Sequence, residues 1–125
     1  MITSYYAAAL ALILVQLAMG VIRLRRAHQV RLGDGDNPTL QAAIRAQANA
    51  AEYIPPALVL LVVLELNGGH WLLLHLGGLT LVIGRILHAR ALATDSIRLR
   101  VLGMQCTLFP IIGLALACVG YAASG

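Results

Sequence analysis

Four long runs of apolar residues follow one another along the chain, and short polar segments separate them. About 20 apolar residues are enough for a helix to cross the hydrocarbon core of a membrane. We therefore expect membrane-spanning helices at about residues 4–22, 38–66, 71–91 and 97–122. The pattern predicts an all-α integral membrane protein, a four-transmembrane-helix bundle that forms a single domain over residues 1–125.

The segments between these runs carry the signals that begin and end helices. Asn37 can cap the second helix, and Pro38 suits its first helical position. Asn67-Gly68-Gly69 predicts a tight turn after that helix, and Trp71 follows where an interfacial aromatic anchor is expected. The second predicted helix is longer than the hydrocarbon core requires, so its first two turns are expected in or beyond the headgroup region.

Composition and charge support a membrane protein and suggest its orientation. Hydrophobic residues make up 60% of the chain, charged residues only 11%, and the mean hydropathy is +0.84, which leaves too few polar residues to cover a soluble core. All nine basic residues are arginines, and eight of them lie in or beside the first and third loops. The positive-inside rule then predicts cytoplasmic first and third loops, with both termini on the opposite side.

The absence of a recognisable targeting signal and the small size of the chain suggest a bacterial inner membrane. Membrane lipid is then an expected partner, and nucleic acid is not.

A polar stripe interrupts the second apolar run. Steps of four, four, three and four residues place Gln41, Arg45, Asn49, Glu52 and Pro56 on one face of a helix. Ionisable groups at membrane depth are costly and usually mark a functional site. This face is therefore expected to contact protein and not lipid.

The predicted topology brings further polar residues to the same half of the membrane as the stripe. They are Arg85 and His88 on the third helix, and Arg98 or Arg100 at the start of the fourth. Several arginines near Glu52 favour a small polycarboxylate ligand, because the planar guanidinium binds carboxylates through paired hydrogen bonds. No histidine or cysteine spacing predicts a metal site. Glu65, near the opposite interface, is expected to be a solvated helix end.

These residues resemble the MAPEG family, the membrane-associated proteins of eicosanoid and glutathione metabolism, over nearly the whole chain. Residues 22–26 resemble the basic end of the family's first helix, and Gly84-Arg85-x-x-His88 resembles part of its third. The segment 45–56 resembles the helix-two motif through Arg45, Gln47, Asn49, Glu52, Tyr53 and Pro56.

The resemblance implies a homotrimer that binds glutathione between subunits near the cytoplasmic face. It also implies which residues hold the polar backbone of glutathione: Arg23, Arg45, Asn49, Glu52, Tyr53, Arg85 and His88. In this family an arginine at the start of the fourth helix is thought to stabilise the glutathione thiolate. Here the candidates are Arg98 and Arg100, and the spacing to Pro110 favours Arg100.

The chain departs from the family pattern at two places. Leu92 occupies a position on the third helix where a tyrosine is expected, and no serine follows either candidate arginine. A prostaglandin synthase subtype is therefore disfavoured, and glutathione loses a possible hydroxyl contact.

Three functions remain in competition. The first is a glutathione transferase-like enzyme that conjugates glutathione to a lipophilic electrophile or reduces a hydroperoxide. The second is a member of the family that keeps the fold but acts as a non-catalytic binding or scaffold protein. The third is a small four-helix drug transporter, which the lack of a carboxylate in the first span argues against.

Overall fold

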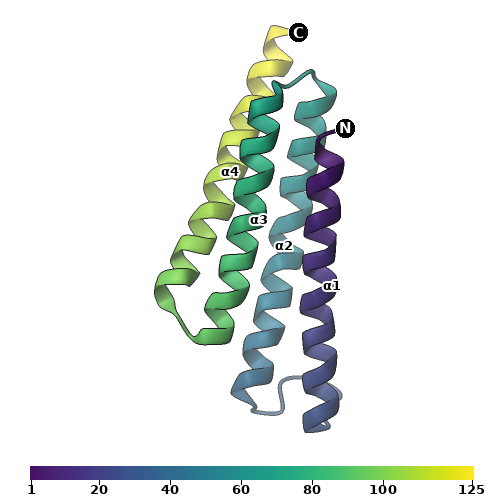
Figure 1. Ribbon diagram of the computed structural model, residues 1–125, viewed down its shortest axis with the longest axis vertical. Helices are drawn as coiled ribbons and strands as arrows, with labels where there is room; N and C mark the ends of the chain where they lie inside the picture. Colours follow the sequence, from purple (N-terminus) through teal and green to yellow (C-terminus); the bar gives the residue numbers. More distant parts are fainter.

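A computed structural model describes residues 1–125, which form four α-helices. The helices are α1 (Thr3–His28), α2 (Pro38–Leu66), α3 (Trp71–Thr94) and α4 (Ile97–Ser124). Each is long and apolar enough to cross a membrane. They run alternately up and down, so both termini and the α2–α3 turn lie at one end and the other two loops lie at the opposite end (Figure 1). We call these the terminal end and the arginine-rich end.

Side-chain caps begin α2, where Asn37 was expected, and α4. The Asn37 side chain accepts a hydrogen bond from the Leu40 amide at 3.0 Å, and Ser96 accepts one from the Leu99 amide at 3.3 Å. Helix α1 continues past the expected end of the span near residue 22, to His28. Arginine, leucine and alanine favour helix, and no glycine or proline interrupts residues 21–28. The arginine-rich ends of α1 and α2 project beyond the α3–α4 turn (Figure 1).

Helices α3 and α4 approach each other most closely, and glycines allow it. A Cβ atom added at Gly103 would lie 2.7 Å from the backbone nitrogen of His88, and one at Gly84 would lie 2.9 Å from Cys106. On the other face of α3, Gly78 makes room for the Tyr6 ring of α1. Gly113 of α4, by contrast, has open space around it, with nothing within 4 Å of an added Cβ.

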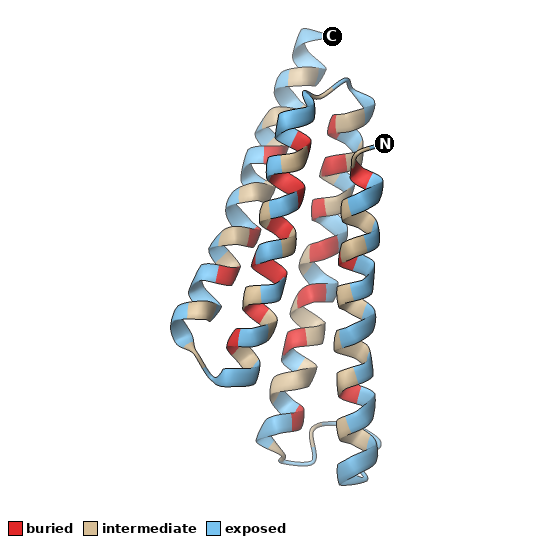
Figure 2. Ribbon diagram, in the orientation of Figure 1, coloured by how far each residue is buried: buried red, intermediate tan, exposed pale blue.

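The buried core is thin. Only 21 of the 125 residues are buried, mainly where α2 and α3 face their neighbours, and most of α1 and α4 is exposed (Figure 2). The largest apolar cluster joins α2, α3 and α4 in the half of the bundle near the terminal end, through Ala57, Leu61, Leu64, Leu74, Leu81 and Leu114. The exposed apolar faces suit contact with lipid or with another protein.

Polar contacts fasten α1 to the rest of the bundle at the terminal end. The Glu65 carboxylate accepts hydrogen bonds from the backbone amides of Ile2 and Thr3, the latter at 2.9 Å. Helix α1 has no side-chain cap of its own, so a carboxylate from α2 takes that place. Tyr6 and Nδ1 of His75 form a second link at 2.7 Å. The expectation that Glu65 is merely a solvated helix end was wrong.

Candidate functional site

Arg85 forms the centre of a polar network that joins three helices. Its side chain, on α3, is 1% exposed. Nη2 donates to Oδ1 of Asn49 on α2 at 2.6 Å, and Nη1 donates to the Thr107 hydroxyl on α4 at 3.4 Å. One guanidinium therefore ties α2 and α4 to α3 in the half of the bundle that carries the arginines.

His88 belongs to the same network. It lies one helical turn after Arg85, is 3% exposed, and has its Nδ1 atom 3.2 Å from Nη2 of Arg85. A guanidinium can only donate, so Nδ1 must accept, and the proton of a neutral imidazole is then on Nε2. The close approach of α3 and α4 at Gly103 brings the His88 backbone against α4. This contact fixes the position of the network along the two helices.

Thr107 is the member of this network that sequence reasoning missed. Its hydroxyl donates to the Gly103 carbonyl at 2.8 Å, which leaves its oxygen lone pairs free for Arg85. A threonine bonded to the carbonyl four residues earlier is common in helices. The only signal in the sequence was the spacing of a small residue and a hydroxyl, four apart, on an otherwise apolar helix.

The electrostatics of the network are unbalanced. The partners of Arg85 are an amide, a hydroxyl and an imidazole, and none of them is a carboxylate. Its Nε atom is buried and has no partner at all. A guanidinium that has been removed from water without a counter-ion favours an anion nearby.

The other predicted site residues lie outside this network. Arg45 and Glu52 are exposed on the outer face of α2, and Tyr53 is half-buried there. Arg23, Arg98 and Arg100 are exposed at the arginine-rich end. The structure thus brings together Asn49, Arg85 and His88 within one chain and leaves the remaining six residues on its surface. No group of three or more His, Cys, Asp or Glu side chains is placed to hold a metal ion.

The polar stripe of α2 remains uncovered in the single chain. Gln41, Arg45, Glu52 and Pro56 are exposed, and Asn49 is half-buried at its centre. If hydrocarbon surrounded Arg45 and Glu52, burying each charged side chain at the centre of the membrane would cost about 2.5–3.5 kcal/mol. This face therefore requires protein, ligand or headgroups against it.

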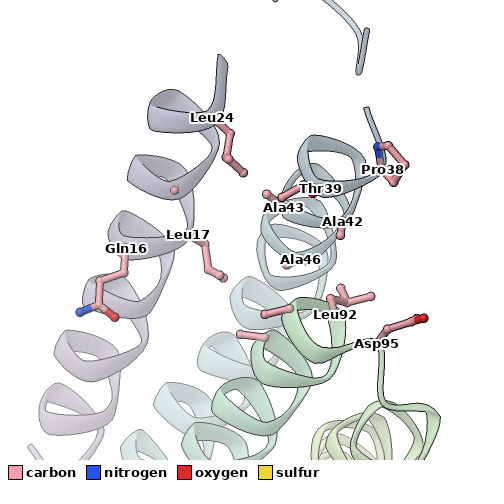
Figure 3. A pocket seen from close by; sticks show the side chains of 13 residues that line it. Gln16, Leu17, Leu24, Pro38, Thr39, Ala42, Ala43, Ala46, Leu92 and Asp95 are labelled. Carbon is pink, nitrogen blue, oxygen red and sulfur yellow. The ribbon is translucent and has the colours of Figure 1, made fainter. Parts of the chain in front are cut away.

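A cavity of about 530 Å³ lies between α1 and the α2–α3 pair at the arginine-rich end (Figure 3). Small residues form much of its wall, and Leu17 and Leu24 extend from α1 toward the alanines of α2 (Figure 3). Leu92, the residue at the expected tyrosine position, also lines it. The cavity is therefore mainly apolar, in contrast with the stripe on α2.

Comparison with known proteins agrees with this architecture. The chain is 37% identical over 121 residues to the inner membrane protein YecN of Escherichia coli K12, covering 97% of this chain and 92% of that protein. The protein of the same name from E. coli O6:H1 strain CFT073 matches equally. The MAPEG family model matches residues 3–120. With a family match over nearly its full length and four membrane-crossing helices, this chain is an integral membrane protein of the MAPEG family.

Proposed function

We propose that the protein is a membrane-bound glutathione transferase-like enzyme. The observation that carries this proposal is the α2 stripe, where Arg45 and Glu52 lie exposed on a membrane-crossing helix beside Asn49, which Arg85 holds at 2.6 Å. Both charge signs on one face suit a zwitterionic ligand with carboxylates and an ammonium group. Glutathione has both, and membership of the MAPEG family supports this choice.

The placement of each site residue supports a role for it in this proposal. Arg45 and Arg23 are exposed and free to bind carboxylates, while Glu52 accepts from the ammonium group. Arg85 and His88 are buried, so they act mainly through Asn49, whose carbonyl oxygen is held by Arg85 and whose NH₂ group is left to donate to the ligand. Tyr53 is a further polar contact on the same helix.

The chemistry requires a thiolate. Arg100, or Arg98 in its place, stabilises the negative sulfur, which attacks an electrophilic carbon of a lipophilic substrate. The sulfur electron pair forms the new carbon–sulfur bond. In a substitution, the electrons of the broken bond leave with the departing group. In an addition to a double bond, they take up a proton. In hydroperoxide reduction, two glutathione molecules are oxidised to the disulfide while the hydroperoxide becomes an alcohol and water.

Assembly and orientation belong to the same proposal. The uncovered stripe on α2 is expected to meet a neighbouring subunit, and we propose a homotrimer with the ligand between subunits. The arginines gather at the end that carries the α1–α2 and α3–α4 loops, which supports placing those loops in the cytoplasm. The name of the E. coli relative supports a bacterial inner membrane location.

One observation favours a second candidate, a binding or scaffold protein without catalysis. Leu92 replaces the expected tyrosine and lines an apolar cavity, so it supplies no hydroxyl to glutathione. In this case the protein would bind glutathione but would not form the thiolate.

Calorimetry of glutathione binding to the detergent-purified protein tests both candidates, with thiolate absorbance measured in parallel. We would compare the wild type with Arg98→Ala and Arg100→Ala, and use Arg90→Ala as a control because it is also exposed at this end but outside the site. We expect a thiolate signal in the wild type and the control that is lost in Arg100→Ala. Binding without any thiolate signal supports the scaffold, and no binding refutes both candidates.

A further inference from the structure

The cavity between α1, α2 and α3 has a wall of unusually small side chains. Gly20 of α1, with Ala42, Ala43 and Ala46 of α2 and Ala89 and Ala93 of α3, surround the open space. A Cβ atom added at Gly20 would meet nothing within 4 Å. The volume of about 530 Å³ falls within the range of small-molecule sites, about 300–1,000 Å³. The three helices therefore leave room for a ligand inside one subunit.

The cavity follows the helix axes from the end of the bundle toward the middle of the membrane. On α1 its lining extends from Leu24 to Gln16, and on α2 from Pro38 to Ala46. Eight residues of helix correspond to about 12 Å. Pro38 begins α2 and Asp95 follows the last residue of α3, so one end of the cavity lies at the level of the loops. The other end lies where the helices are surrounded by hydrocarbon. This shape suits an elongated molecule with one polar end.

The polar side chains of the cavity indicate which polar head group a bound molecule would carry. Thr39 and Asp95 lie at the loop end and Gln16 lies at the deeper edge, and all three are exposed at the mouth or rim of the cavity. Asp95 is the only charged residue in the lining, although arginines are abundant at this end of the molecule. A free carboxylate without a basic partner attracts a hydrogen-bond donor or a cation and repels an anion.

We propose that this cavity binds a single-chain amphiphile with a hydroxyl or amine head group. The head lies at Asp95 and Thr39, and the alkyl chain follows the alanine-lined wall toward Ala46 and Ala89. The same carboxylate disfavours a fatty acid, whose anionic head group would lie against it. The inference does not depend on the proposed function, since it uses no residue of the glutathione site.

The location nevertheless places such a ligand next to the buried polar network. Ala46 precedes Asn49 by one turn of α2, and Ala89 follows His88 directly on α3. The deep end of the alkyl chain therefore approaches the network that Arg85 organises. The Glu65 contacts lie at the other end of the bundle, so occupancy of the cavity leaves them undisturbed.

Photolabelling tests the proposal on the full-length protein in phosphatidylcholine nanodiscs. The probes are a long-chain alkylamine, the matching alkanol and the matching alkyl carboxylate, each with a photoreactive diazirine in the chain, and labelled peptides are identified by mass spectrometry. The key variant is Gly20→Leu, which adds a bulky side chain to the cavity wall at a position where an added Cβ meets nothing within 4 Å. Gly120→Leu is its matched control, because this glycine also has open space but lies on α4 outside the cavity.

We expect the amine and the alcohol to label peptides of α1, α2 and α3 that line the cavity, and the carboxylate to label them roughly tenfold less. Gly20→Leu should reduce labelling by the amine roughly tenfold, which corresponds to about 1.4 kcal/mol, while Gly120→Leu labels as the wild type does. Asp95→Asn should remove the preference for amine over carboxylate, and asparagine tolerates the positive φ of 54° at this position.

Three results would overturn the proposal. Equal labelling of Gly20→Leu and the wild type would show that the probes bind elsewhere. A carboxylate probe that labels as strongly as the amine would refute the role of Asp95. Absence of labelling in the wild type, together with a changed oligomeric state of Gly20→Leu in size-exclusion chromatography, would show that the cavity holds part of a second copy. A loss of glutathione binding has no bearing on any of these results.

Discussion

The contact between α3 and α4 at Gly103 gives the sharpest test of the structure. In Gly103→Ala the new methyl group would lie 2.7 Å from the His88 nitrogen, 2.9 Å from its Cα and 3.0 Å from the Gly84 carbonyl. All three are backbone atoms, so no side chain can rotate away. To reach an ordinary contact of 3.4 Å, the two helices must separate by about 0.7 Å.

This separation has two costs. Inserting a methyl group into a packed contact destabilises a protein by about 1–3 kcal/mol. The hydrogen bond from Arg85 to Thr107 is already 3.4 Å long, so it would break when α4 moves. The lost hydrogen bond adds about 1 kcal/mol. Alanine gains about 0.5–1 kcal/mol over glycine within a helix, which leaves a net destabilisation of about 1–3.5 kcal/mol.

The measurement is unfolding in mixed micelles with increasing fraction of SDS, followed by circular dichroism. Gly113→Ala and Gly120→Ala are matched controls, because both glycines lie on α4 with nothing within 4 Å of an added Cβ. We expect these controls to be as stable as the wild type or slightly more stable. If Gly103→Ala unfolds at the same SDS fraction as the controls, the backbone contact between α3 and α4 is not present and the reasoning fails.

Two further side-chain contacts are testable in the same assay. Thr107→Val keeps the shape but leaves Nη1 of Arg85 unpaired, so we expect a loss of about 1 kcal/mol, with Thr107→Ser close to wild type; equal loss in both variants would contradict this. Tyr6→Phe removes the hydrogen bond to His75 and should cost about 0.5–1.5 kcal/mol, whereas Tyr5→Phe, on an exposed side chain, should cost nothing measurable. Matching effects of the two tyrosines would show that the link to α1 does not form.

The helices and their beginnings could be predicted because each depends on local sequence. Membrane-crossing helices follow from the length of the apolar runs, and Asn37 and Ser96 cap the residues that follow them. The face shared by Arg45, Asn49 and Glu52 also follows from helix periodicity alone. These features need no knowledge of what lies across the bundle.

The partners of the polar residues could not be predicted, because periodicity gives a face but not the residue opposite it. Arg85 was expected at a ligand site, yet its side chain points between helices toward Asn49 and Thr107. Thr107 itself has no distinctive neighbours in the sequence. Glu65 was expected in solvent because its partners, the amides of Ile2 and Thr3, are more than 60 residues away.

The two ends of the bundle differ in how firmly they are held, and this difference suits a binding protein. At the terminal end, Ile2 and Tyr6 pack against the largest apolar cluster, and the hydrogen bonds of Glu65 and Tyr6 join α1 to α2 and α3. At the arginine-rich end, the same helices are separated by a cavity lined with glycine and alanine. Ligand sites usually lie in the less stable part of a fold, because groups there can rearrange without unfolding the whole. A firm terminal end therefore allows α1 to adjust around a ligand at the other end while Arg85 keeps α2, α3 and α4 in register.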